Sequence, residues 1–243
     1  MNYIDHLREL RNRIILCFLF LIFSFLIFLF FSDFVAKLLL EPLYNNIRNP
    51  SERRMIFTGL PEVFTSNLKI SLFASFLFSL PFFITQFVFF VSPALYKKEK
   101  FFFIPILFLI PILFFFGVLF SYYFLIPVIW NFFLSFENFI GGSFNVELES
   151  RYSEYMKLTM YLLFASGISF LFPILLILLT KIKILNIEHL KKYRKYFIIG
   201  ILIFSAIFTP PDIISQVGIA IPLLIFYELS IIFIQIFILK KNA

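Results

Sequence analysis

The chain has 243 residues, of which 61% are hydrophobic, 41 are phenylalanine and 14% are charged, and its net charge is +7. This apolar content exceeds the roughly 45–50% of soluble domains, and charges fall between long apolar runs, which predicts an all-α membrane protein. A single cysteine, Cys17, excludes a disulfide framework, two histidines exclude paired haem ligands, and no metal or other cofactor is expected.

Six apolar runs are candidates to cross a hydrocarbon core of about 30 Å, which takes about 20 helical residues. They span residues 14–32, 69–92, 101–133, 158–180, 197–209 and 213–239. The third is too long for one perpendicular helix, and Pro105, Pro111 and Pro127 predict that it is kinked or tilted. The fifth makes only about 20 Å of helix, which is short for a crossing. With no repeat or linker, residues 1–243 are expected to form a single polytopic domain.

Basic residues predict the orientation, because Lys and Arg are retained on the cytoplasmic-type side. Six crossings put both termini on one side, and placing the termini inside gives that side 14 of the 21 basic residues. We therefore interpret the positive net charge as an orientation signal rather than as a sign of nucleic-acid binding. The first run is not followed by a small-residue cleavage site and no Arg/Ser-rich leader precedes it, so we expect synthesis in the compartment that uses the protein.

Two acids lie on the predicted inner side within a few residues of the membrane. Glu9 belongs to "HLRELRNRI" (residues 6–14) and Glu99 to "SPALYKKEK" (residues 92–100). Glu9 is placed to pair with Arg13 at i, i+4, and Glu99 has lysine neighbours, so a basic membrane anchor and a solvated loop acid remain possible interpretations. Two carboxylates in this position are also suited to two guanidinium groups, which bind carboxylates in a bidentate geometry that lysine does not reproduce.

Polar residues also interrupt the apolar runs themselves. Pro81 and Gln86 lie in the second run, and Glu228 lies near the middle of the sixth. A carboxyl group at that depth is costly, so Glu228 is expected to face protein or a wet cavity, as a functional acid or as a hydrogen-bonded structural one. Between the fifth and sixth runs, "TPPD" (residues 209–212) predicts a rigid outer turn with an acidic helix start, and the short fifth run draws Asp212 and Gln216 toward the membrane.

Several of these segments together resemble one family of membrane proteins. They are "HLRELRNR" at 6–13, "EPL" at 41–43, "VFTSNLKISL" at 63–72, "LPFFITQFVFFVSPALYKKEK" at 80–100 and "TPPDIISQVGIAIPLLIFYE" at 209–228. In this order they resemble TatC, the multispanning subunit of the twin-arginine protein translocase. The resemblance implies a glove-shaped bundle of six transmembrane helices with a concave face. It also implies a receptor for twin-arginine signal peptides that moves folded proteins across an energy-coupled membrane using the proton-motive force.

The resemblance also implies roles for individual residues. Glu9 and Glu99 would bind the two arginines, assisted by Arg11, Arg13, Tyr96 and Lys97. The apolar part of the signal would follow the concave face past Pro42, Phe64, Lys69 and Gln86. Small single-span TatA/TatB-type subunits would dock at Thr209, Asp212 and Gln216 in a homo- and hetero-oligomer. One position departs from the family: Leu171, in "SFLFP", replaces a membrane-buried glutamate that is associated with partner binding.

Other interpretations are weaker. A proton-coupled secondary transporter or channel would use Glu228, but the matching half-repeats of such proteins are absent from the sequence. An enzyme is not expected, because Ser, His and Asp do not meet at one predicted depth. Many Phe, Leu, Ile, Lys and Asn residues suggest an AT-rich genome, which favours an organelle-encoded protein of the mitochondrial inner membrane, with a bacterial plasma membrane or a plastid thylakoid membrane as alternatives.

Overall fold

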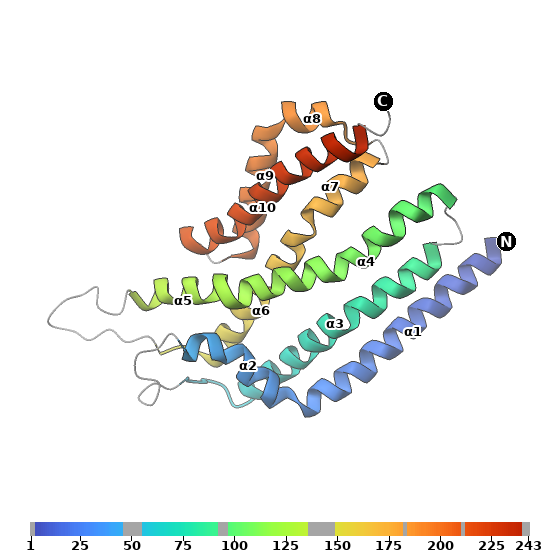
Figure 1. Ribbon diagram of the computed structural model, residues 1–243. Helices are drawn as coiled ribbons and strands as arrows, with labels where there is room; N and C mark the ends of the chain where they lie inside the picture. The colour runs from blue at the N-terminus through green and yellow to red at the C-terminus, as the bar shows by residue number, and fades with distance from the viewer. Residues whose placement is uncertain are drawn as a thin grey trace. The chain divides into compact units, whose positions relative to one another are not determined.

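The computed structural model describes residues 3–45, 55–91, 97–135, 149–181, 184–209 and 212–239. Within these ranges the chain is helical apart from short turns and an isolated β-bridge between Ile56 and Arg151 (Figure 1). The elements are α1 (Tyr3–Phe30), α2 (Ser32–Tyr44), α3 (Glu62–Val91), α4 (Lys97–Phe120), the π-helical turn η2 (Ser121–Leu125), α5 (Ile126–Ser135), α6 (Tyr152–Phe170), α7 (Phe172–Lys181), α8 (Ile187–Lys192), α9 (Arg194–Phe208), α10 (Ile213–Phe233) and the π-helical turn η4 (Ile234–Leu239).

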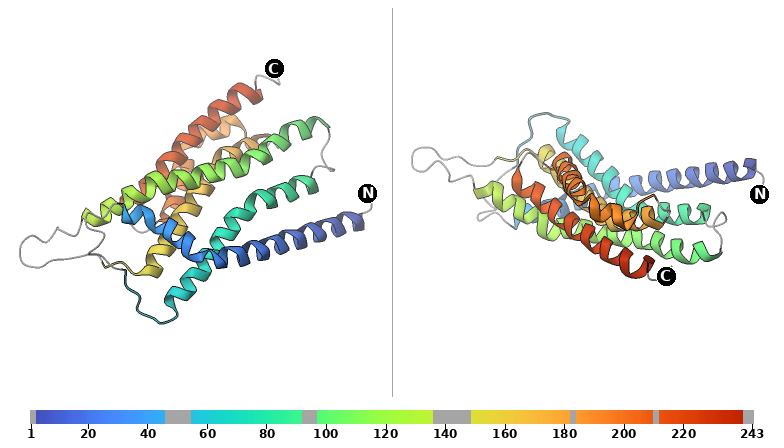
Figure 2. Two further views of the ribbon diagram at one scale, coloured as in Figure 1. Left: turned by 60° about the horizontal axis from the view of Figure 1, so that its bottom comes forward. Right: turned by 90° about the horizontal axis from the view of Figure 1, so that it is seen from above.

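The chain divides into two compact units, and α4 and α6 each contribute to both. The first unit holds Met1–Ile112 and Glu149–Met160, and the second holds Leu113–Leu148 and Tyr161–Ala243. In the first unit α1 lies along α3, as both views in Figure 2 show. Serines line this contact: Ser24 Oγ and Ser79 Oγ are 3.3 Å apart, and Ser71 Oγ donates to the Phe28 carbonyl at 3.2 Å. Small residues let helix backbones approach closely in a membrane, so this pair can pack tightly without a hydrophobic driving force.

In the second unit α10 is the central element and packs against α7, α9, η2 and α5. Gly218 of α10 lies close to Leu125, since a Cβ added there would collide with Leu125 Cδ1 and that side chain would have to move. At the other end of α10, the buried Tyr227 hydroxyl donates to the Leu190 carbonyl at 2.6 Å, which attaches α8 to α10.

A π-helical turn separates α4 from α5 within the third predicted run. The Ile126 amide donates to the Ser121 carbonyl five residues earlier, and Pro127 follows at the second position of α5. Proline has no amide hydrogen and its ring collides with the carbonyl four residues before it, so a wider turn accommodates it. Pro105 and Pro111 instead lie inside the α-helical part of α4.

The prediction of an all-α membrane protein is confirmed. Among the residues that the structure describes, five helical segments are long and apolar enough to cross a membrane: His6–Phe30, Glu62–Phe90, Ile104–Ser135, Tyr152–Thr180 and Ile213–Ile236. The predicted fifth crossing corresponds to α9, whose 15 residues are shorter than these segments. Several helices also begin before the predicted apolar runs, since α1 starts at Tyr3, α3 at Glu62 and α6 at Tyr152. Their first turns carry polar residues that a hydropathy count does not include.

Candidate functional site

The N-terminal part of α1 carries a compact polar cluster. Arg13 donates to Glu9 Oε1 twice, from Nη2 at 2.6 Å and from Nε at 3.0 Å. The third nitrogen, Nη1, donates to Gln86 Oε1 on α3 at 3.1 Å. The Glu9 and Arg13 side chains are only 23% and 25% exposed. Spacing of four residues brings Glu9 and Arg13 together on one face of α1, and packing of α1 on α3 adds Gln86.

Aromatic rings surround this cluster. The His6 ring stacks on Phe90 with centroids 4.4 Å apart, and the Arg13 guanidinium lies 5.8 Å from the centre of the Phe89 ring. His6 Nδ1 is 3.8 Å from Glu9 Oε2. That Oε2 atom is buried and accepts no hydrogen bond from any residue that the structure describes. One carboxylate oxygen of Glu9 is therefore held by Arg13, while the other has no hydrogen-bond donor among the described residues.

The remaining predicted arginine-site residues are only partly placed. Arg11 Nη2 donates to Asn12 Oδ1 at 3.3 Å on the exposed side of α1, away from the pair of Arg13 and Glu9. Tyr96 lies outside the described residues. Lys97 and Glu99 belong to the first turn of α4, but their side chains also lie outside the described part of the chain.

The four predicted concave-face residues do not form one cluster. Pro42 is buried within α2, Phe64 is 67% exposed on the first turns of α3, and Lys69 is exposed about one and a half turns later. Gln86 lies 22 residues after Phe64 on the same helix, which corresponds to about 33 Å of helix axis. Gln86 therefore belongs with Glu9 and Arg13 rather than with Phe64.

At the outer end, the predicted docking residues are bonded within their own hairpin. Asp212 is the N-cap of α10, and its carboxylate accepts from the Ser215 amide at 2.7 Å and from the Ser215 hydroxyl. Thr209 Oγ1 donates to the Ser205 carbonyl at 2.9 Å, and Gln216 Nε2 donates to the Leu202 carbonyl at 3.2 Å. These bonds join the end of α9 to the start of α10.

The structure gives Glu228 a charged partner. The sequence predicts this acid near the middle of a crossing, and it lies within the apolar segment Ile213–Ile236. Its Oε2 accepts from Arg194 Nη2 at 3.0 Å, and the two side chains are about half exposed. Arg194 is the first residue of α9. Glu228 is therefore level with the start of α9, where its charge is neutralised by a cation that follows the basic α8.

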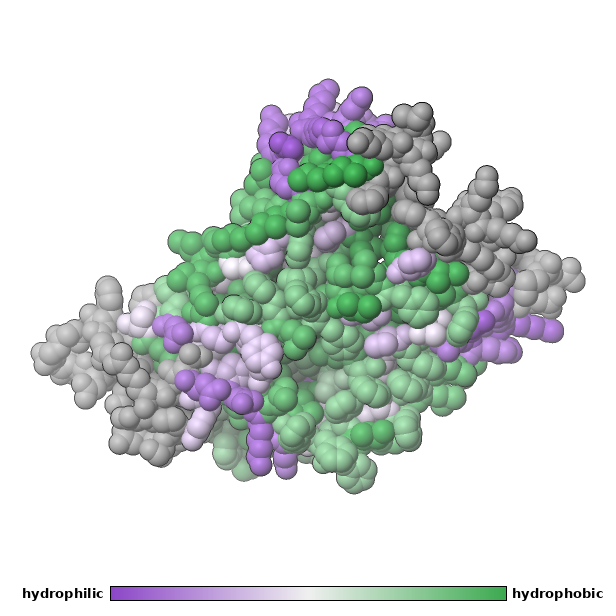
Figure 3. Space-filling view, in the orientation of Figure 1, coloured by the Kyte–Doolittle hydropathy of each residue, from purple (hydrophilic) through white to green (hydrophobic). Residues whose placement is uncertain are grey.

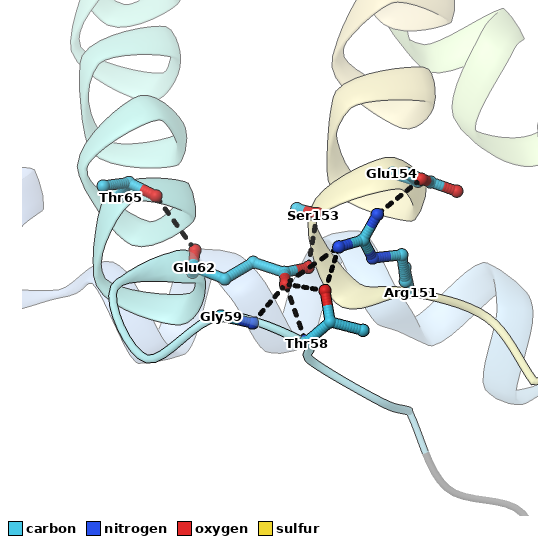
Figure 4. Close-up of polar contacts among 7 residues, drawn as sticks. All are labelled: Thr58, Gly59, Glu62, Thr65, Arg151, Ser153 and Glu154. Atoms are coloured by element: carbon cyan, nitrogen blue, oxygen red, sulfur yellow. Dashed lines mark hydrogen bonds and ion pairs between the residues drawn. The ribbon is translucent and has the colours of Figure 1, made fainter.

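A second polar cluster escaped the sequence analysis. Glu62, at the start of α3, accepts from the amides of Thr58 at 2.8 Å and Gly59 at 3.2 Å, and from the Ser153 hydroxyl at 2.5 Å (Figure 4). Arg151 lies 3.6 Å from the same carboxylate and also bonds Thr58. The cluster fastens the start of α3 to the start of α6. An acid following Pro61 signals a helix start, but nothing local in the sequence identifies partners about 90 residues away.

Comparison with known proteins identifies the family. Residues 5–222 match the family model of the Sec-independent protein translocase protein TatC. The TatC protein of Rickettsia prowazekii is 42% identical over 231 residues, covering 95% of this chain and 91% of the relative, and that of Escherichia coli K12 is 30% identical, covering 98% and 89%. A crystal structure of the twin arginine translocase receptor TatC in DDM superposes with a TM-score of 0.77 at 35% identity, covering 93% of this chain and 98% of that one. The chain therefore belongs to the TatC family and is a multi-pass membrane component of the Sec-independent protein translocase.

Proposed function

We propose that this chain is the receptor and core subunit of the twin-arginine translocase, binding twin-arginine signal peptides and moving folded proteins with the proton-motive force. One observation carries the binding site: the Glu9 carboxylate is held through Oε1 by Arg13, while its buried Oε2 accepts no hydrogen bond from the described residues. The family and the receptor structure with a TM-score of 0.77 support the role.

The chemistry of this carboxylate suits an arginine of the signal. A guanidinium offers five N–H donors in a planar fork, so it can bond Oε2 while stacking against the neighbouring aromatic rings. Phe90, which stacks on His6, and Phe89, which lies beside the Arg13 guanidinium, supply such rings near this pair. A lysine ammonium is a point charge that meets neither demand. In this proposal the second arginine is bound by Glu99, assisted by Arg11, Tyr96 and Lys97.

The test measures binding of a labelled signal peptide to the purified protein in nanodiscs, with two arginines or two lysines in the peptide. Glu9→Gln keeps the size of the side chain and removes its charge. Loss of one charge-assisted hydrogen bond, worth about 1.5–3 kcal/mol, predicts roughly 10- to 150-fold weaker binding of the twin-arginine peptide. Glu154→Gln is the matched control, because that glutamate lies 70% exposed at the start of α6. Equal affinity of the native protein and Glu9→Gln would refute the assignment.

Export supplies the second readout. Glu9→Gln and Glu99→Gln are each expected to abolish export of twin-arginine cargo while the protein remains folded and inserted. Unchanged export in both variants would refute the receptor role itself.

We further propose that the apolar part of the signal passes Lys69, Phe64 and Pro42 on its way to the outer side, a path that matches the length of α3 between Gln86 and Phe64.

The partner contact is proposed on α10. Large apolar side chains repeat every four residues along one face of this helix, and all are exposed: Ile213, Val217, Ile221 and Ile225. The hairpin residues Thr209, Asp212 and Gln216 hold the outer end of this face in place through bonds within the hairpin. We propose that single-span TatA/TatB-type subunits pack along it. A photo-crosslinker at position 217 should capture a small single-span protein that the same group at the exposed position 199 on α9 does not, and capture of lipid alone at 217 would contradict this.

The proposed location is the mitochondrial inner membrane, supported by a composition typical of an AT-rich genome, with 41 phenylalanines among 243 residues. Subcellular fractionation with an antibody against the chain tests it, and recovery with plasma or thylakoid membranes would contradict it.

Transport as proposed here involves no covalent chemistry by this chain. The transporter alternative gains no support from Glu228, whose carboxylate is bonded to Arg194.

A further inference from the structure

An apolar cavity lies within the second unit, between α6 and α7 on one side and α9 on the other, with Leu223 of α10 completing it. Its volume is about 600 Å³. The α9 wall consists of residues that recur on one helix face: Tyr196, Phe197, Gly200, Ile201 and Phe204. A Cβ added to Gly200 would meet no atom within 4 Å, so the space in front of this wall is open.

The cavity offers almost nothing to a polar ligand. Its one serine, Ser169, already donates its hydroxyl to the Ala165 carbonyl at 2.7 Å. Leu171, the residue that replaces the family's glutamate, contributes a further aliphatic surface. The α6–α7 wall and α10 belong to segments long and apolar enough to cross a membrane, and the lining is apolar, so hydrocarbon is the matching occupant.

The wall from Tyr196 to Phe204 runs eight residues, or about 12 Å along the helix axis. Flexible acyl chains can follow an apolar wall of this length and fill the space beside it.

A basic segment adjoins the inner end of the cavity. Lys191, Lys192, Arg194 and Lys195 are all exposed at the end of α8 and the start of α9, and Tyr196 follows directly and lines the cavity. In Figure 3 the hydrophilic colour gathers over α8 and the start of α9, above hydrophobic surface. Arg194 shares its charge with Glu228, while Lys192 and Lys195 lie over the rings of Tyr193 and Tyr196, at 5.7 and 5.2 Å.

We propose that this cavity and its basic rim form a binding site for one anionic phospholipid. The acyl chain fills the space in front of Gly200, and the phosphate lies at the membrane surface between Lys192 and Lys195. Charge complementarity selects the lipid, since clusters of Lys and Arg at the inner end of a membrane helix attract anionic headgroups. This inference stands independently of the receptor role and of the arginine site at Glu9.

The test is native mass spectrometry of the full chain, purified in detergent and supplied with equal amounts of phosphatidylglycerol and phosphatidylcholine. The native protein is expected to retain one phosphatidylglycerol. The double variant Lys192→Gln, Lys195→Gln should bind it about 30-fold more weakly, from about a fivefold loss per lysine. Lys37→Gln on α2, an exposed lysine of the first unit, is the charge control and should bind normally.

Filling the cavity tests the acyl chain separately. Gly200→Phe places a ring where an added Cβ meets nothing, so the fold should tolerate it and the lipid should be lost. Ile203→Phe is the matched control, because Ile203 is 56% exposed on α9 and does not line the cavity. Three results would overturn the proposal: equal retention of phosphatidylcholine, unchanged retention in Gly200→Phe, or a photo-crosslinker at position 200 that captures a partner helix or a signal peptide in place of lipid.

Discussion

Gln86 joins the arginine site to α3, and replacing it with methionine isolates that contribution. Methionine has a similar length and volume but cannot accept the bond that Arg13 Nη1 donates to Gln86 Oε1 at 3.1 Å. In the variant Arg13 can keep its two bonds to Glu9 Oε1, at 2.6 and 3.0 Å, so Glu9 stays near its native position. The Arg13 guanidinium, however, is less firmly oriented. We expect the fold to persist and signal binding to weaken.

The structure sets the size of this effect. A hydrogen bond to a charged group contributes about 1.5–3 kcal/mol, and the quarter exposure of Arg13 reduces this to about 1–2 kcal/mol. When this free energy no longer holds Glu9 in the orientation that binds the signal, the affinity for the twin-arginine peptide falls by about 5- to 30-fold. The assay is titration of a labelled twin-arginine peptide against the protein in nanodiscs, with thermal unfolding in parallel.

Thr85→Val is the control for Gln86→Met. Thr85 is the preceding residue on α3, and its hydroxyl donates to the Pro81 carbonyl of its own helix at 2.7 Å, so its loss does not touch Arg13. An unchanged dissociation constant in Gln86→Met, with the native unfolding temperature, would refute the positioning role. Equal weakening in Thr85→Val would show that α3 responds to any substitution there.

Three further substitutions test the structure. Tyr155→Phe leaves the buried Leu39 carbonyl without the bond that it accepts at 2.8 Å, which should cost about 1 kcal/mol and lower the unfolding temperature by about 2–4 °C. Gly117→Val puts a Cβ 2.6 Å from the Ser166 carbonyl oxygen and should destabilise the second unit by about 1–3 kcal/mol in denaturant unfolding. Asp212→Ala removes the N-cap of α10 and should accelerate hydrogen exchange in its first turn through a loss of about 1 kcal/mol.

Each of these has a result that would contradict it. Asp212→Asn keeps an N-cap oxygen, so hydrogen exchange in the first turn of α10 should match that of the native protein. Faster exchange in Asp212→Asn as well as in Asp212→Ala would mean that the charge of Asp212, rather than its capping bond, is responsible. Gly200→Ala meets no atom within 4 Å and controls for Gly117→Val, so equal destabilisation of both would reject the close-approach argument. An unchanged unfolding temperature in Tyr155→Phe would mean that water replaces the hydroxyl.

Hydropathy alone predicted the helical membrane class, because a bilayer leaves no water for backbone groups and each crossing must satisfy its own hydrogen bonds. The pair of Glu9 and Arg13 was also within reach of the sequence, since four residues bring two side chains to one face of a helix. The same local reasoning identified Asp212 as a helix start, and the structure places it as the N-cap of α10. The extent of α1 and α3 was not within reach, because their first turns are polar.

Tertiary packing decided the partners that are distant in sequence. Gln86 meets Arg13 across 73 positions, Ser153 meets Glu62 across 91, and Arg194 meets Glu228 across 34. Each contact depends on which helices pack together and on their axial register. In a membrane both are set by close packing of small and polar side chains rather than by hydrophobicity. Composition therefore determined that this chain crosses a bilayer as helices, while the packing of α1 on α3 and of α9 on α10 determined which polar groups those helices bring together.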